Sequence, residues 1–319
     1  MQVQKQYDWQ IIGAGAIGCL WAVNLIRSGQ KVQLITRKSS LATTITYQNL
    51  QGLTKDYPCS LSNHLQYSNA PILVCVKATQ VKQALLDQKQ QINSKQVIIL
   101  MHNGMGTAEQ VANLFPDNPI ICATTSNACL VKSPFNIQQT GLGITYLGAF
   151  NEPAKSCDHL LKDLDNALGN CHWNENVEQT LWLKLLINIA INPLTAIHQI
   201  KNGELAEDSF QAQINTMLDE ALPVLQAIGL LSEDASTENN VFERSNLLNT
   251  VNGVIHATSE NFSSMNRDIY HQRLTENEFI NGYLLKKASQ HNIETPLIKK
   301  LYQQIVALEN NLVTQLNTK

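Results

Sequence analysis

A glycine motif near the N-terminus constrains the fold of this 319-residue chain more than any other feature. Residues Gly13–Gly18 read Gly-x-Gly-x-x-Gly, directly after a short apolar run at Trp9–Ile12. An amphipathic stretch follows at about Ala16–Arg27, and a second β-type run at Lys31–Thr36. Strand, glycine turn, helix and strand in this order are typical of a βαβ unit whose turn and helix N-terminus bind the phosphates of a dinucleotide.

Each glycine of the motif has a physical role in such a unit. The first permits the tight turn, the second lets the backbone approach a pyrophosphate, and the third lets the helix pack closely on the strand. The alternative, a glycine-rich turn without a ligand, accounts less well for the agreement of strand, helix and spacing. The loop predicted to contact the cofactor comprises Gly13, Ala14, Gly15, Ala16, Ile17 and Gly18.

The rest of the first half continues the alternation of β-type runs and helical patterns. Further strands are expected at Ile72–Val76, Val97–Met101 and Ile120–Thr124, and Ile137–Leu147 is expected to add one or two strands at the edge or end of the sheet. Alternating strands and helices indicate a parallel sheet covered by helices on both faces. We therefore predict an N-terminal, doubly wound Rossmann-type domain that binds a dinucleotide, over residues 1–174; the residues after its second strand, described below, favour NADP(H).

From about Asn174 the strand-like runs give way to helical periodicity. An all-α domain that binds substrate and carries the catalytic groups is predicted over residues 175–319. The chain is thus predicted to be an α/β protein with an all-α C-terminal domain. Helices are expected at Val177–Ile197, Ser209–Ala227 and Thr275–Gln290, and from the Thr295-Pro296 start signal towards Leu312.

The residues after the second strand indicate which dinucleotide is bound. An NAD enzyme usually has an acidic side chain there for the ribose 2′-hydroxyl, whereas this chain has Thr36-Arg37-Lys38. A guanidinium matches a 2′-phosphate, so Arg37 favours NADP(H); Lys38 can equally be a solvated loop charge. Lys77 and Asn103 are the first polar side chains after two later strands, where they either face the ligand crevice or cap the next helix.

A polar stripe interrupts the apolar segment Leu181–Leu194. Lys184, Asn188 and Asn192 are spaced by four residues, so they lie on one face of a helix that is otherwise apolar almost all round. A buried amine and buried amides are costly unless they are satisfied by hydrogen bonds. The alternatives are a lysine that extends to the surface and amides that bond to neighbouring helices, or a ligand that all three contact.

Several segments together resemble ketopantoate reductases (2-dehydropantoate 2-reductases) over nearly the whole chain. They are Gly13–Gly18, Lys77-Ala-Thr-Gln80, His102–Thr107, Trp182–Ala196, Asn202-Gly-Glu-Leu205, and Ser263–Ile269 followed by Thr275-Glu276. The resemblance implies NADPH-dependent reduction of 2-dehydropantoate to (R)-pantoate, in the pantothenate and coenzyme A pathway. It also implies that Lys184 is the proton donor to the keto oxygen and that Glu276 holds the cofactor and the catalytic geometry.

The same resemblance implies which other residues contact the ligands. For the substrate these are Lys184, Asn188, Asn192, Asn202, Asn261 and Ser264, and for NADPH they are Arg37, Lys77, Asn103, Glu276 and, through its backbone, Cys129. Two other functions stay open: the same chemistry on another small branched 2-keto acid, and a non-catalytic module that senses NADP(H). For Ser264 and its neighbour Ser263, a helix N-cap role is as compatible with the sequence as substrate contact.

Composition excludes several other classes of function. The formal net charge is −3 and only 15% of residues are charged, so neither a nucleic acid nor a membrane surface is an expected partner. No apolar run of about 18 residues and no signal-peptide pattern is present, which indicates a soluble, cytoplasmic protein. The seven cysteines lack Cys-x-x-Cys spacing, and no metal site is expected. Either a monomer or a homodimer is compatible with the sequence.

Overall fold

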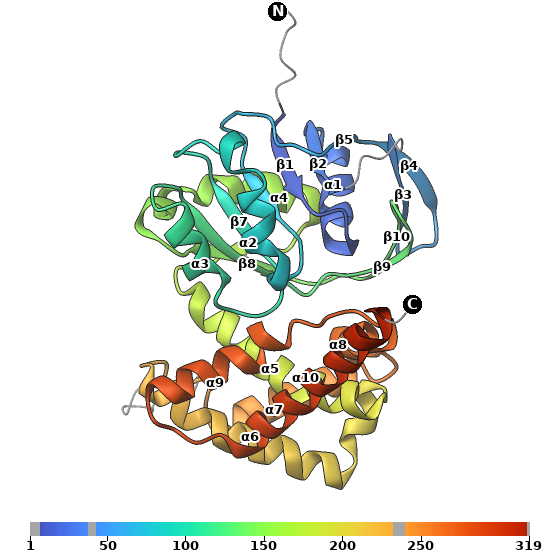
Figure 1. Cartoon of the computed structure of the whole chain (residues 1–319). Helices are drawn as coiled ribbons and strands as arrows, with labels where there is room; N and C mark the ends of the chain where they lie inside the picture. Colours follow the sequence, from blue (N-terminus) through green and yellow to red (C-terminus); the bar gives the residue numbers. More distant parts are fainter. Residues whose placement is uncertain (1–6, 38–42, 232–239, 318–319) are drawn as a thin grey trace, which may run out of the picture. The chain divides into compact units, whose positions relative to one another are not determined.

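The computed structural model describes residues 7–37, 43–231 and 240–317, with side chains described as far as residue 311. The chain divides into two compact units (Figure 1). The α/β unit comprises Met1–His102 and Gly106–Val177, and the helical unit comprises Asn103–Met105 and Glu178–Lys319. The change at Val177 falls shortly after the expected boundary at residue 174. Three residues of the first half, Asn103–Met105, pack as part of the helical unit.

The α/β unit is built on an eight-stranded sheet. In spatial order its strands are β12 (Cys171–Trp173), β11 (Thr145–Ala149), β8 (Ile120–Thr125), β7 (Ile98–Met101), β6 (Ile72–Val74), β1 (Trp9–Ile12), β2 (Val32–Ile35) and β5 (Ser60–Ser62). All neighbours are parallel except the antiparallel pair β8–β11. The five strands predicted from their apolar runs are confirmed as β1, β2, β6, β7 and β8, each within a few residues of its expected bounds.

Helices cover both faces of this sheet, as the doubly wound prediction requires. From β1 the chain moves through α1 (Ala16–Arg27) to β2 on one side, and from β6 it moves through α2 (Ala78–Leu86) and α3 (Thr107–Leu114) to β7 and β8 on the other. Right-handed crossovers in opposite directions place α1 on one face and α2 and α3 on the other. On the face of α1 lies α4 (Leu161–Leu168), which packs against it. Short 3₁₀ turns lie at η1 (Lys89–Gln91), η2 (Glu152–Ser156) and η3 (Asp158–Leu160).

A second, four-stranded sheet was not predicted. Its order is β4 (Thr54–Pro58), β3 (Thr44–Gln48), β10 (Asn136–Gly141) and β9 (Ala128–Ser133). Of the one or two strands expected from Ile137–Leu147, one, β11, joins the main sheet next to its end strand β12, whereas β10 pairs with β3 and β9 in the second sheet. The second sheet packs on α1 (Figure 1), and this explains why α1 is buried on nearly all sides.

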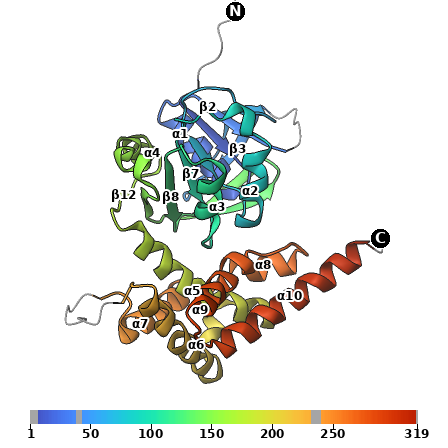
Figure 2. The same cartoon turned by 60° about the vertical axis from the view of Figure 1, so that its left-hand side comes forward.

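The helical unit is formed by α5 (Val177–His198), α6 (Asp208–Ala227), α7 (Arg244–Ala257), α8 (Ser264–Tyr270), α9 (Asn281–Gln290) and α10 (Pro296–Asn317), with 3₁₀ turns η4 (Asn202–Ala206) and η5 (Asn277–Phe279). Figure 2 shows the same helices from a second side. The predicted helices α5, α6 and α10 are confirmed. The predicted helix at Thr275–Gln290 was wrong at its start, because residues 275–280 form an irregular segment and α9 begins at Asn281.

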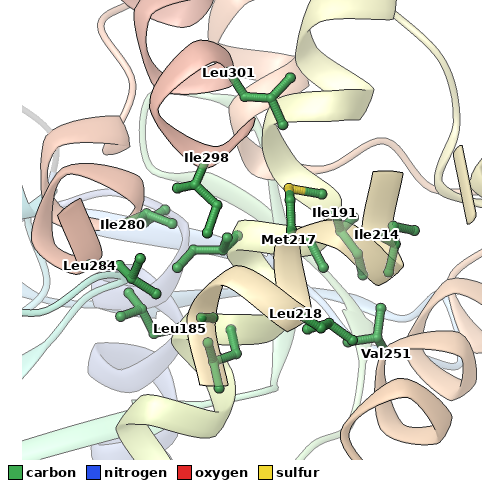
Figure 3. Close-up of a cluster of buried hydrophobic side chains, with 14 of the residues drawn as sticks. Leu185, Ile191, Ile214, Met217, Leu218, Val251, Ile280, Leu284, Ile298 and Leu301 are labelled. Carbon is green, nitrogen blue, oxygen red and sulfur yellow. The ribbon is translucent and has the colours of Figure 1, made fainter. Parts of the chain in front are cut away.

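Helix α5 is the centre of the core of the helical unit. Leu185 and Ile191 pack with Met217 and Leu218 of α6, and with further apolar side chains of α7, α9 and α10 (Figure 3). Among the described residues, α5 alone is long and apolar enough by composition to cross a membrane, yet 61% of its apolar window is buried inside the protein. Its hydropathy is that of a core helix, since its apolar side chains face the other helices.

Candidate active site

The glycine loop between β1 and α1 has the geometry of a phosphate-binding turn. Gly13 has φ +111°, a left-handed conformation that glycine adopts without steric cost, and its N–H donates to Ile35 O at 3.1 Å. A Cβ at Gly13 would lie 2.8 Å from the Val76 side chain and 3.0 Å from the Val76 backbone nitrogen. The loops that follow β1 and β6 therefore touch, and they do so where the strand order reverses, which is where such sheets bind ligands.

The other two glycines differ in what surrounds them. A Cβ at Gly18 would lie 1.8 Å from Gly13 O, so the helix can pack this closely on the turn only without a side chain. A Cβ at Gly15 would meet no atom within 4 Å. Gly15 is the N-cap of α1 and provides no side-chain cap, so the first N–H groups of the helix open onto free space. This cradle fits the diphosphate of a dinucleotide.

Further predicted cofactor residues lie in the α/β unit. Arg37 is exposed directly after β2, and Lys38 lies outside the described residues. Lys77 directly precedes α2, and its side chain makes no capping hydrogen bond, so the helix-capping alternative does not hold. Cys129 lies in β9 and is close enough to Cys19 in the second turn of α1 for their charges to interact. Burial raises the pKa of the Cys129 thiol to about 12, so it stays protonated at neutral pH.

In the helical unit, three predicted site residues come together. The Nδ2 atom of Asn103 donates to Oε2 of Glu276 at 3.2 Å, although the two residues are 173 positions apart in the sequence. Glu276 is 8% exposed and interacts electrostatically with Lys184. The N-cap of α3 is Gly106, so Asn103 does not cap that helix and its amide is directed to the carboxylate instead. Lys184, Glu276 and Asn103 thus form a compact polar cluster.

The position of Lys184 explains its acidity. Burial lowers the pKa of the Lys184 amine from 10.5 to about 8, and the neighbouring Glu276 carboxylate opposes that shift. An ammonium group with a pKa near the operating pH can both stabilise a developing negative charge and give up its proton. Residue Lys184 is partly exposed as a whole, while its amine is desolvated strongly enough for burial to be the main cause of the lowered pKa. The alternative of a lysine that extends freely into solvent does not fit this burial.

The two asparagines of the stripe lie one and two turns further along α5. Asn188 is partly buried and Asn192 is buried. Within the described part of the chain, neither side-chain amide hydrogen-bonds to another protein group. The alternative in which these amides bond to neighbouring helices is therefore not what the structure shows. Their donors and acceptors remain for solvent or a ligand on the face that carries Lys184.

The remaining predicted substrate residues are placed differently from one another. Asn202 is buried: its backbone N–H donates to Asn261 O at 2.9 Å, and its Nδ2 donates to Oγ1 of Thr258 at 2.8 Å. The local sequence did not reveal this bond because Thr258 is 56 residues away. The Oδ1 atom of Asn202 is buried and has no hydrogen-bond partner among the described residues. Asn261 is exposed and Ser264 is exposed as the first residue of α8.

The helix-capping hypothesis for the serine pair is resolved in favour of the first serine. The Ser263 hydroxyl accepts from Asn266 N, and Oγ1 of Thr195 lies 2.7 Å from Ser263 Oγ. The Thr195 hydroxyl also donates to Ile191 O within α5. A buried network thus links the start of α8 to the end of α5. In the described residues, no group of three or more His, Cys, Asp or Glu side chains is placed to hold a metal ion.

Comparison with known proteins gives the same relatives for both units. The family model described as Ketopantoate reductase PanE/ApbA matches residues 9–152, and the model described as Ketopantoate reductase PanE/ApbA C terminal matches residues 176–309. The chain is 37% identical over 305 residues to the 2-dehydropantoate 2-reductase of Vibrio cholerae, which covers 94% of this chain and 97% of that protein. It is 29% identical over 306 residues to the enzyme of the same name from Bacillus subtilis, with 94% and 97% covered.

Solved structures share the fold. A probable 2-dehydropantoate 2-reductase from Bacillus subtilis matches with a TM-score of 0.76 and 27% identity over 94% of this chain and 99% of that one. A D-mandelate dehydrogenase solved with NADH and anilino(oxo)acetate matches with a TM-score of 0.81 at 20% identity, over 95% and 99% of the two chains, and this shows the fold alone. The two family models together span most of the sequence, and the chain belongs to the ketopantoate reductase family.

Proposed function

We propose that this protein reduces 2-dehydropantoate to (R)-pantoate with NADPH, as a cytoplasmic enzyme of pantothenate and coenzyme A biosynthesis. The observation that carries the proposal is the polar cluster of the helical unit, in which the buried Glu276 carboxylate accepts from Asn103 and interacts electrostatically with the Lys184 amine. The cluster occurs in a chain that is similar over 94% of its length to curated 2-dehydropantoate 2-reductases. A small-molecule 2-keto acid is the partner that this chemistry requires.

The α/β unit supplies the cofactor site in this proposal. The open space beside Gly15 and the first N–H groups of α1 fit the diphosphate of NADP(H). The exposed Arg37 fits its 2′-phosphate. Lys77, Asn103, Glu276 and the backbone of Cys129 complete the proposed cofactor contacts. When bound, NADPH supplies the hydride that the C2 carbonyl carbon of the substrate accepts.

Residues of the helical unit stabilise the negative charge that develops on the substrate. As the carbonyl carbon is reduced, negative charge develops on its oxygen, and the Lys184 ammonium stabilises that charge and transfers a proton to it. The neutral amine that results is protonated again from solvent. Glu276 keeps the charged form of Lys184 more stable than burial alone would allow. Contacts to the carboxylate and hydroxyl groups of the substrate are assigned to Asn188, Asn192, Asn261 and Ser264, since amides and hydroxyls both donate and accept. Asn202 is assigned to the substrate through its Oδ1 atom, because its Nδ2 atom is bonded to Thr258.

A direct test is NADPH oxidation, followed by absorbance, with a panel of 2-keto acids. The proposal expects kcat/KM for ketopantoate to exceed the values for ketoisovalerate and pyruvate. A higher value for ketoisovalerate would assign the enzyme to another branched 2-keto acid. Tight NADPH binding with no turnover of any keto acid would support a non-catalytic sensor instead.

Arg37→Ala is expected to weaken NADPH binding by about 10- to 100-fold, because charge-assisted hydrogen bonds contribute about 1.5–3 kcal/mol. NADH lacks the 2′-phosphate, so its affinity should change little. Titration of both cofactors by protein fluorescence measures the ratio of the two dissociation constants. The matched control is Lys55→Ala, which removes an exposed cation from β4 of the same unit. An unchanged NADPH/NADH ratio in Arg37→Ala would contradict the assignment.

The pH dependence of the reduction should follow Lys184. Reduction needs the ammonium form, so kcat/KM is expected to fall as the pH rises through about 8. Glu276→Gln removes the carboxylate that raises the pKa of Lys184, so the fall should move to lower pH in that variant. Rate profiles of both proteins between pH 6 and pH 10 (roughly the range that brackets this pKa) measure the shift. A profile that is the same in both proteins would show that the carboxylate does not act on the proton donor.

A further inference from the structure

The segment that carries Glu276 has no regular helix to hold it. Residues 275–280 contain only the short turn η5, and Glu276 is the residue before that turn. Helical periodicity predicted a helix here, so some interaction outside the segment must set its conformation. The conformation of this segment matters for function, because the proposed function requires the Glu276 carboxylate to stay close to Lys184. The inference below rests on that proposed function.

A carboxylate on the last helix anchors the segment on one side. Oε1 of Glu309, in α10, accepts a hydrogen bond from Thr275 N at 2.7 Å and another from Thr275 Oγ1 at 2.6 Å. Oγ1 of Thr275 in turn accepts from Asn277 N at 3.0 Å. Thr275 is 2% exposed, so these bonds are shielded from water. Hydrogen bonds to a carboxylate are among the stronger ones in proteins. Glu309 therefore fixes the backbone immediately before and after Glu276.

Other contacts hold the far end of the segment. The Asn277 side chain donates to Tyr302 O of α10 at 3.1 Å and accepts from Asn281 Nδ2 at 2.7 Å. Ile280 is buried in the apolar core around α5 (Figure 3). At Phe279 the carbonyl accepts from Met105 N at 2.8 Å. Glu276 thus lies between the Thr275 anchor and the contacts made by Asn277, Phe279 and Ile280.

We propose that Glu309 is a positioning residue for the Lys184–Glu276 pair. It acts through Thr275: the two hydrogen bonds hold the segment so that the Glu276 carboxylate lies beside the Lys184 amine and accepts from Asn103. Glu309 itself contacts neither the amine nor the substrate in this assignment. Both of its bonds end on a single oxygen, so an amide oxygen at the same place can accept them without the charge.

Because both hydrogen bonds end on one oxygen of Glu309, substitutions can distinguish a positioning role from a purely electrostatic one. Glu309→Gln keeps an acceptor oxygen, whereas Glu309→Ala removes it, and Thr275→Ser keeps the hydroxyl that Thr275→Val removes. Glu278→Gln is the matched control, because Glu278 is exposed on the same segment and bonds to Tyr302 of the same helix. Besides Glu276 and Glu278 of the segment itself, the charged and titratable groups that interact with it are Lys184, Tyr302 and Glu309.

The experiment uses the full chain and three measurements. They are kcat/KM for ketopantoate as a function of pH, the titration of the Lys184 amine by NMR on ¹³C-labelled lysine, and the melting temperature. Glu309→Ala and Thr275→Val are expected to lower kcat by about 10- to 100-fold, the scale of a misplaced catalytic group, and to shift the Lys184 titration to lower pH. Glu309→Gln, Thr275→Ser and Glu278→Gln are expected to keep the wild-type titration.

A double variant completes the test. If Glu309 acts through Glu276, then Glu276→Gln with Glu309→Ala should titrate and turn over like Glu276→Gln alone. Additive losses would overturn the proposal, and so would a lower melting temperature in Glu309→Ala with an unchanged Lys184 titration. If Glu309→Ala does not fold, a comparison of the Lys184 titration in Thr275→Val and Thr275→Ser tests the proposal in the same way. The NMR titration needs no turnover, so it decides the proposal even if ketopantoate is not the substrate.

Discussion

Lys184→Ala is expected to lower kcat for keto-acid reduction by about 10²- to 10⁴-fold, the usual contribution of a positioned general acid. The substitution removes the amine that stabilises the charge developing on the carbonyl oxygen and supplies its proton. The dissociation constant for NADPH should stay within a few-fold of the wild-type value, because the glycine loop proposed to bind the phosphates is part of the α/β unit.

Two further variants make this result interpretable. Lys286→Ala removes an exposed lysine from α9 in the same unit, and its kcat should equal that of the wild type. Lys184→Met keeps the length of the side chain, so it should lose as much activity as Lys184→Ala without leaving a cavity. Steady-state kinetics and a fluorescence titration with NADPH measure both quantities. Turnover near the wild-type rate in Lys184→Met would remove the proposed proton donor.

Alanine at two glycines of the phosphate loop should have opposite effects on stability and binding. Gly18→Ala would place a Cβ 1.8 Å from Gly13 O, so the helix must move off the turn, and we expect a loss above about 4 kcal/mol in the free energy of unfolding. Gly15→Ala meets no protein atom within 4 Å, and its φ of −80° suits alanine. Its stability should therefore be that of the wild type.

The same Gly15→Ala variant should lose NADPH affinity, because its methyl group occupies the space that the diphosphate needs. A decrease of about 10- to 100-fold is expected, corresponding to roughly 1.4–2.7 kcal/mol of binding free energy. Thermal denaturation and cofactor titration of both variants are the measurements. Wild-type NADPH affinity in Gly15→Ala would show that the phosphates lie elsewhere. A melting temperature equal to the wild-type value in Gly18→Ala would contradict the tight packing of α1 on the turn.

The sequence predicted best where a pattern is local. The apolar runs at β1, β2, β6, β7 and β8 are strands because they lie in the middle of a sheet covered on both faces, which selects continuous apolar side chains. The bounds of α1 were correct because its apolar face and its Ser28-Gly29 end both mark them. The polar stripe on α5 followed from the helical repeat alone. These features depend on residues within about two turns of one another.

Prediction failed where contacts distant in the sequence decide the structure. The second sheet brings β3 beside β10, and nothing in either short segment indicates that partner. The segment 275–280 has helical periodicity, but Glu309 and Tyr302 of α10 bond to its backbone and side chains and prevent the helix from starting there. The bond from Asn202 Nδ2 to Thr258 likewise joins residues 56 positions apart, so the local motif does not reveal it.

By itself, the sequence determined the α/β and helical halves, the glycine loop and the spacing of Lys184 on α5, because periodicity and turn chemistry are properties of neighbouring residues. Only the tertiary structure decided that Asn103 and Glu276 meet, that Glu276 faces Lys184, and that Gly15 opens onto free space. The acidity of Lys184 belongs to the second group as well. Burial lowers the pKa of the Lys184 amine, and the Glu276 carboxylate opposes that shift. Both effects depend on side chains that the fold brings together from distant parts of the chain.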